Sequence, residues 1–299
     1  MENIMKKTIL IAALIMCMTL AFAQAIDETK GGVVRLGVMQ GPTGFSSSMI
    51  GDIAEISVYP SPNEAVARLA KGELDMAALP ANAAANIYSK GIGIKAVAVV
   101  GEGMLSVLGT DSSSSTLAVP GAGGTPDHMA QLLYGEYEAD YSVTAPAQLA
   151  QLVIAQKAAL AILPQPFVSM VLAQNPNVEV YHDVQEDWMA LTGQAQYPMS
   201  ILVVRSEYAQ EHPLEVELMK DAYKGSVESI LEDPQKAGVR IEELGIMKAA
   251  MATPAIEHCA LVFKDGKQAK DEVQAYFETL MDLAPEAIGG KLPDDGFWL

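Results

Sequence analysis

The chain has 299 residues, half of them apolar, and 19 Lys and Arg stand against 37 Asp and Glu. A formal charge of −18 without a basic cluster argues against nucleic-acid binding, because phosphate recognition needs lysine and arginine gathered on one face. The apolar half supplies enough material for a core and excludes a wholly disordered chain. This length is compatible with one large domain or with two, and the segment pattern favours two lobes.

The first 23 residues have the pattern of a secretory signal peptide. Two lysines precede an apolar run over 8–22, and Ala21 and Ala23 place small residues at the −3 and −1 positions for cleavage before Gln24. Ala23 and Ala25 offer the same spacing for a second option, cleavage before Ile26. The run is shorter than the roughly 20 residues that span a bilayer. We therefore expect a cleaved signal peptide over 1–23 and an exported protein of the periplasm or cell envelope.

The two cysteines bear on how the protein is anchored and stabilised. Cys17 lies inside the apolar run and raises the alternative of a lipoprotein, but bulky Met16 stands where a lipidation signal has a small residue. Removal of the signal peptide leaves Cys259 without a partner for an internal disulfide, so stability must come from packing. We favour the cleaved signal over a lipid anchor on Cys17, and we expect Cys259 to be a buried structural thiol.

From residue 33 onward, short apolar runs rich in strand-forming residues alternate with segments of helical period, which is typical of an α/β fold. The first strand is expected over 33–39 and ends in the breaker-rich loop 40–45. Four strand starts in about 70 residues match the spacing of β–α–β units. Further strands of this series are expected over 56–59, 74–80 and 94–100, and helices from 46, over 62–71 and over 81–90.

A serine-rich run over 111–115 breaks the composition, and a second strand–helix series begins at 116–120. The long apolar strand over 199–204 indicates the return to the first lobe, after which the pattern is helical. The other expected elements are strands over 158–163 and 178–181, and helices from 125 and over 146–156, 167–174, 214–231, 234–244, 254–259 and 267–283. The expected lobes are 33–109 plus 207–299, and 116–204.

None of the four histidines lies in a catalytic or metal-binding motif. The sequence contains no Gly-x-Ser-x-Gly elbow, no His-Glu-x-x-His and no Gly-Lys-Ser/Thr phosphate loop. We expect neither a catalytic residue nor a bound metal or cofactor, and we interpret each histidine as an ordinary surface or capping residue. These histidines are His128, His182, His212 and His258.

The most informative local feature is the run Val-Pro-Gly-Ala-Gly-Gly-Thr-Pro-Asp over 119–127. A strand runs into glycines, Thr125 suits the N-cap of a helix, and Pro126 suits its first position. Such a turn can present backbone N–H groups to an anion or a carbonyl group, and a well-capped helix without a ligand explains it equally well. Asp127 already offers negative charge to the helix dipole and would oppose a doubly charged ligand.

The loop at 40–45 and the segment 79–82 fall at the carboxyl ends of predicted parallel strands, where ligands of open α/β sheets bind. The strand ends lack arginine, which weakens the case for a bulky oxyanion. Five aromatic residues, Phe45, Tyr59, Phe167, Trp188 and Tyr197, are candidates to line a cleft, and Phe45 and Trp188 are favoured. The predicted ligand-binding residues are Gln40, Thr43, Phe45, Pro80, Asn82, Gly124, Thr125, Gln165 and Trp188.

Several segments resemble the solute-binding proteins of ABC importers, in particular the branch associated with nitrate, sulfonate, taurine and thiamine-pyrimidine uptake. The resemblance implies an α/β fold of the periplasmic-binding-protein type II class, with two lobes joined by two hinge crossovers and a solute bound between them. Its cleft positions correspond here to 40–45, 80–82, 123–125 and 165–166. The segments that carry it are 72–82 (GELDMAALPAN), the glycines before Thr125, 158–167 (AALAILPQPF), 202–208 (LVVRSEY) and 288–295 (IGGKLPDD).

We therefore expect a monomeric, non-enzymatic binding protein that captures a small organic solute and delivers it to an ABC permease in the membrane. Asp127 and the aromatic candidates favour a planar, heteroaromatic or zwitterionic solute over a sulfonate or nitrate. Enzymes of the same fold, such as pyrimidine synthases and menaquinone-pathway dehydratases, are the alternative, and the signal peptide discriminates because those enzymes act in the cytoplasm. A ligand sensor for a membrane receptor is a third candidate.

Overall fold

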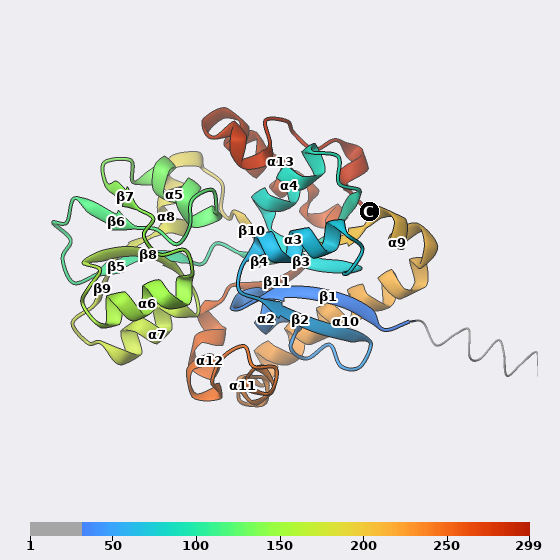
Figure 1. Cartoon of the computed structure of the whole chain (residues 1–299), viewed down its shortest axis with the longest axis horizontal. Coiled ribbons are helices and arrows are strands. Elements are labelled where there is room, and N and C mark those ends of the chain that lie inside the picture. The colour runs from blue at the N-terminus through green and yellow to red at the C-terminus, as the bar shows by residue number, and fades with distance from the viewer. Residues whose placement is uncertain (1–31) are drawn as a thin grey trace, which may run out of the picture. The chain divides into compact units, whose positions relative to one another are not determined.

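The computed structural model describes residues 32–299, and the signal peptide predicted over 1–23 lies outside these residues. Two β-sheets, one of six strands and one of five, organise the unit Val34–Leu299 (Figure 1). The α/β class expected from the alternating pattern is confirmed. No helix within 32–299 combines the length and the apolar character that crossing a membrane requires.

The six-stranded sheet has the order β11-β4-β10-β3-β1-β2. Strand β1 pairs in parallel with β2 and β3, whereas β10 runs antiparallel between β3 and β4. The direction of β10 is reversed because it enters from the other sheet rather than through a helical crossover. The strands are β1 (Val34–Met39), β2 (Ala54–Tyr59), β3 (Met76–Pro80), β4 (Ile94–Glu102), β10 (Pro198–Arg205) and β11 (Leu261–Asp265).

The five-stranded sheet repeats this arrangement with the order β7-β6-β8-β5-β9. Strand β6 pairs in parallel with β7 and β8, and β5 runs antiparallel between β8 and β9. Strand β5 thus holds the place that β10 holds in the first sheet, and each sheet contains one strand that arrives directly from the other. The strands are β5 (Leu105–Gly109), β6 (Thr116–Ala118), β7 (Glu138–Asp140), β8 (Leu160–Pro164) and β9 (Glu179–Asp183).

The boundaries between the two halves differ from those expected. Residues 105–109 belong to the five-stranded sheet and 198–205 to the six-stranded sheet. Only Gly103 and Met104 separate β4 from β5, so the first crossover has almost no loop, and the serine-rich run is a turn after β5. Each crossover strand is buried between two neighbours, so its composition resembles that of any core strand and marks no boundary.

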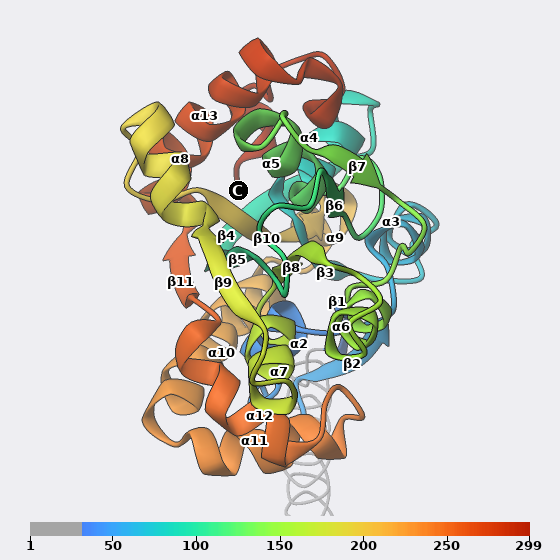
Figure 2. The same ribbon diagram turned by 90° about the vertical axis from the view of Figure 1, so that its left-hand side faces the viewer.

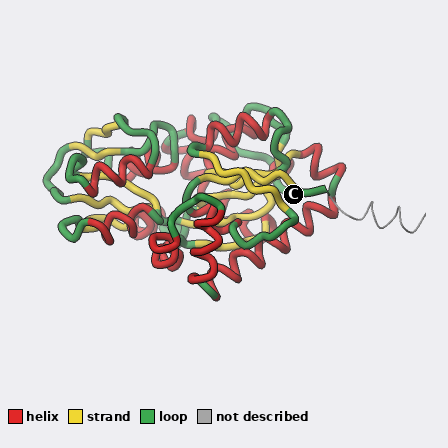
Figure 3. The backbone as a smooth tube through the Cα atoms, turned by 60° about the horizontal axis from the view of Figure 1, so that its bottom comes forward, coloured by secondary structure: helices red, strands yellow, loops and turns green. Residues whose placement is uncertain are grey.

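Helices cover both faces of the sheets, as the red helices on either side of the yellow strands show (Figure 3). In the five-stranded half, α6 and α7 lie side by side (Figure 2). The helices are α2 (Pro42–Ser47), α3 (Pro62–Ala70), α4 (Ala81–Ser89), α5 (Thr125–Leu133), α6 (Pro146–Ile154), α7 (Phe167–Gln174), α8 (Val184–Thr192), α9 (Ser206–Glu211), α10 (Pro213–Glu232), α11 (Pro234–Glu243), α12 (Ala249–Ala255) and α13 (Gly266–Leu283).

Strand β3 shows why its sequence is continuously apolar. Ala77 and Leu79 belong to a core cluster that includes alanines of α4, whereas Met76 and Ala78 belong to another that includes Tyr223 of α10. Successive side chains of a strand point to opposite faces, so a sheet covered on both faces buries every residue. The run over 74–80 therefore predicts a central strand, and β3 occupies the middle of the sheet.

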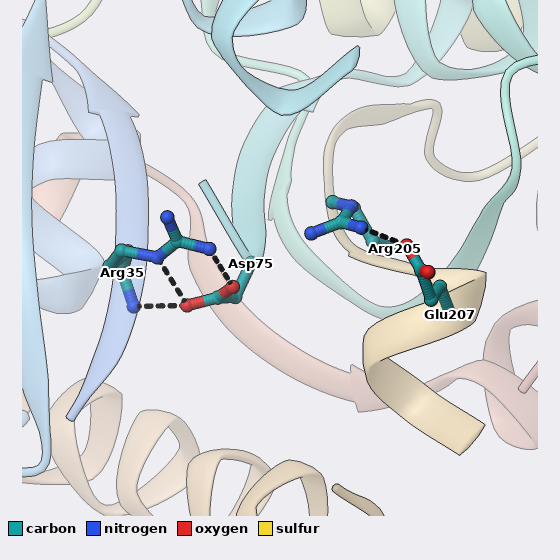
Figure 4. A network of polar contacts seen from close by, with 4 residues as sticks. All are labelled: Arg35, Asp75, Arg205 and Glu207. Atoms are coloured by element: carbon teal, nitrogen blue, oxygen red, sulfur yellow. Dashed lines mark hydrogen bonds and ion pairs between the residues drawn. The ribbon is translucent and has the colours of Figure 1, made fainter. Parts of the chain in front are cut away.

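An ion-pair network lies at the end of the six-stranded sheet where β1 begins and β10 ends (Figure 4). The backbone N and the Nε of Arg35 each donate to Oδ2 of buried Asp75 over 2.9 Å, and the backbone N of Arg205 donates to the carbonyl of Asp75 over 3.0 Å. Arg205 also pairs with exposed Glu207. Burial opposes ionisation of Asp75, but the hydrogen bonds from Arg35 outweigh it and lower the pKa of Asp75.

Candidate functional site

A cavity of about 190 Å³ lies at the carboxyl ends of the parallel strands of both sheets. Its walls come from the segments that follow β1, β2 and β3 in one half and β6, β7 and β8 in the other, together with the starts of β10 and β5. This is the edge at which open α/β sheets bind ligands. The volume is below the roughly 300 Å³ at which pockets for drug-sized molecules begin, so it suits a small solute.

Proline dominates the lining of the cavity. Four of these prolines lie at the first or second position of a helix, namely Pro42, Pro62, Pro126 and Pro146, and four lie at or just beyond strand ends, namely Pro60, Pro80, Pro120 and Pro164. Proline suits the first turn of a helix because the N–H that it lacks would have no helical partner there. The result is a wall of apolar rings with few backbone donors.

The polar groups of the lining are neutral. They are hydroxyls and one amide, and no ionisable side chain belongs to the set of described residues that line the cavity. The hydroxyl of Thr43 is already engaged, since its Oγ1 accepts from the backbone N of Met39 over 2.9 Å. The remaining polar side chains of the lining are Gln40, Ser61, Thr125, Thr144 and Ser200.

The structure brings five of the predicted site residues together around the cavity. Gln40 and Thr43 follow β1, Pro80 ends β3, and Gly124 and Thr125 begin α5 on the opposite wall. These positions come from both halves, as the strand-end argument requires. Their role in binding a ligand remains a prediction.

Asn82 lies beside the cavity and joins the two halves. Its Oδ1 accepts from Oγ1 of Thr125 over 3.1 Å, and its Nδ2 donates to the carbonyl of Gly123 over 3.4 Å. Both ends of the amide are therefore used between α4 and the turn before α5. We interpret Asn82 as a bridge between the halves rather than as a residue that lines the cavity.

Three other predicted site residues lie away from the cavity lining. Phe45 is fully buried on α2, which packs against α10, and Trp188 is fully buried among Tyr197 and Tyr276. Gln165 lies in the turn before α7 and points to that helix, where its Oε1 accepts from Oγ of Ser169 over 2.7 Å. The expectation of an aromatic face from Phe45 or Trp188 is corrected, because both rings fill the core.

Phe167 supplies the aromatic surface of the cavity. It is one of the five aromatic candidates, and it begins α7 after the two-residue turn that follows β8. Met104 and Met199, at the two crossovers, also line the cavity and were not predicted. The recurring proline at or just after a strand end is the sequence signal that could have found most of the remaining wall, because it marks the ends of β2, β3, β6 and β8.

The glycine turn before α5 differs from the expected cap by one residue. Gly124 is the N-cap, Thr125 is the first helical residue, and the hydroxyl of Thr125 bonds to Asn82 instead of capping the helix. The backbone N of Gly123 donates to Oδ2 of Asp127 over 2.6 Å. The carboxylate of Asp127 is thus folded back into the turn that precedes it.

The two crossovers lie against each other beside the cavity. A Cβ atom on Gly103 would fall 2.5 Å from Cε1 of Tyr197 and 2.2 Å from Oε1 of Gln185. The ring of Tyr197 lies 5.7 Å from that of Trp188, and the ring of Trp188 lies 5.6 Å from that of Tyr276 on α13. Glycine at 103 therefore lets the second crossover pack closely onto the first.

Metal-binding and reactive-thiol chemistry finds no support in the described part of the chain. Across 32–299, no group of three or more His, Cys, Asp and Glu side chains is arranged to hold a metal ion. Cys259 is buried in the core of the six-stranded half, and burial raises the pKa of its thiol. A thiol held in its neutral form is a poor nucleophile.

A family model described as menaquinone biosynthesis matches residues 50–289. The chain belongs to the menaquinone biosynthesis family. No curated protein sequence matches the chain.

Solved structures of similar fold include an ABC transporter and periplasmic binding proteins, which confirms the resemblance seen in the sequence. A crystal structure of an ABC transporter from Parabacteroides distasonis is 26% identical with a TM-score of 0.77, and the match covers 89% of this chain and 98% of that one. The aliphatic sulphonate-binding protein SsuA from Escherichia coli is 13% identical with a TM-score of 0.64, covering 87% and 92%. The nitrate-binding protein NrtA from Synechocystis is 13% identical with a TM-score of 0.54, covering 71% and 66%.

Proposed function

We propose that the chain is an exported solute-binding protein that captures a small organic solute between its two halves and delivers it to an ABC permease. The observation that carries this proposal is the cavity formed by the strand ends of both sheets, with Asn82 bridging to Thr125 beside it. A solute in this position touches both halves at once, so its binding favours the arrangement in which they are together. The similar ABC-importer structures support the same role.

An enzyme of menaquinone biosynthesis is the second candidate, and the family match favours it. General acid–base chemistry needs a titratable group within hydrogen-bonding reach of the reacting atoms. The lining residues of the cavity are neutral, which favours capture of a solute over its conversion. The predicted signal peptide over 1–23 also favours the exported role.

Expression of the full 299-residue chain in a Gram-negative host tests the export step. Mass spectrometry should find a mature N-terminus at Gln24 or Ile26 in the periplasmic fraction. Size-exclusion chromatography with light scattering should show a monomer. An intact Met1 in the cytoplasmic fraction would contradict the exported role and favour the enzyme.

A thermal-shift screen of amino acids, pyrimidines, flavins, naphthoquinone precursors and sulfonates tests the binding step. A solute at 100 times its dissociation constant stabilises the folded state by about 2.7 kcal/mol, which the screen detects. Each hit is then incubated with the protein and recovered for mass spectrometry. Recovery of unchanged solute supports a binding protein, whereas a new product identifies an enzyme.

A further inference from the structure

Asp127 is a buried acid that directly follows Pro126 of the cavity lining. It lies on the first turn of α5, two residues after Thr125, and its side chain is 3% exposed. Oδ2 accepts from the backbone N of Gly123 over 2.6 Å, and Oδ1 accepts from Nε2 of Gln131 over 2.9 Å and from the hydroxyl of Tyr141 over 2.6 Å. One carboxylate therefore takes three donors, one of them from the glycine turn.

A glycine turn at a helix N-terminus is a general anion-binding arrangement, because its backbone N–H groups and the helix dipole both favour negative charge. Here the chain's own carboxylate already accepts one of those N–H groups, that of Gly123. An anion entering from the cavity would meet a turn whose Gly123 donor is taken and a negative charge held close behind it. The described residues of the lining offer no arginine, lysine or histidine to compensate.

We propose that Asp127 sets the specificity of the cavity: its carboxylate fills the anion-binding turn from inside, so that the site accepts uncharged solutes and rejects oxyanions. This inference rests on the proposed function, because it names the class of solute that the binding protein captures. It separates this chain from the sulphonate- and nitrate-binding proteins that share its fold. The prolines and Phe167 then supply the apolar contacts that an uncharged solute needs.

The test is an isothermal titration of the exported protein with methanesulfonate, against chloride at equal ionic strength. The parent and Asp127→Asn should both fail to bind, since asparagine keeps the turn filled while removing the charge. Asp127→Ala empties the turn and should bind methanesulfonate at least tenfold more tightly than the parent. Asp127→Ser, which also shortens the side chain, replaces the alanine variant if that variant does not fold.

Binding of methanesulfonate to the parent would overturn the inference, and so would a failure of every folded shortened variant to bind it. Binding by Asp127→Asn as tight as by Asp127→Ala would also overturn it, because occupancy of the turn would then be irrelevant. Failure of the proposed function is a separate result: a parent that binds no solute of any charge in the thermal-shift screen. The two proposals therefore stand or fall on different measurements.

Discussion

Thr125 donates its hydroxyl to the side-chain carbonyl of Asn82 over 3.1 Å, and this hydrogen bond joins the two halves of the protein. The two side chains are 3% and 2% exposed, so the bond is shielded from water. It lies directly beside the cavity, to which Thr125 contributes. A solute and this bond therefore favour the same arrangement of the halves.

The first prediction is that Asn82→Ala weakens solute binding about tenfold or less without unfolding the protein. The variant loses the hydrogen bond to Thr125 and a long one of 3.4 Å to Gly123, so the loss is close to that of one neutral hydrogen bond, about 0.5 to 1.5 kcal/mol. Titration calorimetry with a solute from the screen measures the affinity. Asn86→Ala is the matched control, since Asn86 lies on the same helix but donates to the carbonyl of Glu286, away from the cavity. Equal affinities of Asn82→Ala and the parent would show that the hydrogen bonds of Asn82 between the halves do not contribute to solute binding.

The second prediction concerns the contact between the crossovers. Gly103→Ala should destabilise the folded state by about 1 to 3 kcal/mol, because the new methyl group would collide with Tyr197 and Gln185. Urea unfolding followed by fluorescence measures the change. Gly225→Ala is the control, because a Cβ at 225 in α10 meets nothing within 4 Å and should stabilise the helix by about 0.5 to 1 kcal/mol. The free energy of unfolding should fall for Gly103→Ala and rise for Gly225→Ala. Equal changes in the two variants would contradict the prediction.

The third prediction follows from the lowered pKa of Asp75. A carboxyl group whose folded pKa lies below its unfolded value near 3.9 adds stability above that value and loses it as the pH falls through the folded pKa. Asp75→Asn should therefore cost about 2 kcal/mol at pH 7, and the difference from the parent should shrink below about pH 4. Urea unfolding over a pH series measures both effects.

The control for Asp75 is Glu207→Gln, which removes the exposed partner of Arg205 in the same network. Exposed ion pairs contribute about 0 to 1 kcal/mol, so this variant should change stability little. A difference between Asp75→Asn and the parent that stays constant from pH 7 to pH 3 would show that the charge of Asp75 contributes nothing.

The strands were predictable from sequence because burial on both faces leaves a continuous apolar run. The run expected over 33–39 corresponds to β1 and the run over 74–80 to β3. The assignment of strands to halves was not predictable at the crossovers, where 105–109 and 198–205 resemble any other core strand. The amino-acid composition of a strand shows that the strand is buried. It does not show which of the two sheets contains the strand, because both sheets bury their central strands equally.

The cavity was predictable as a place and less so as a set of side chains. Strand ends indicated Gln40, Pro80 and Thr125, because a parallel strand fixes where its carboxyl end lies. Sequence could not show which of Phe45 and Phe167 lines the cavity. That depends on whether the ring faces a neighbouring helix or the other half of the protein, and the local sequence does not determine this. The hydrogen bond from Gly123 to Asp127 was likewise hidden, although the position of Asp127 already indicated a conflict with anions.

The last prediction uses these two phenylalanines as a matched pair. Phe167→Leu removes the aromatic surface that faces the cavity. The loss of aromatic packing, about 0.5 to 1.5 kcal/mol, should lower the affinity for a planar solute by up to about tenfold. Phe45→Leu changes a ring that is fully buried against α10, so it should lower stability and leave the dissociation constant unchanged. Titration calorimetry gives the affinity of each variant, and thermal unfolding gives its stability. If Phe45→Leu weakened binding as much as Phe167→Leu, the loss would come from the fold as a whole, and Phe167 would have no separate part in holding the solute.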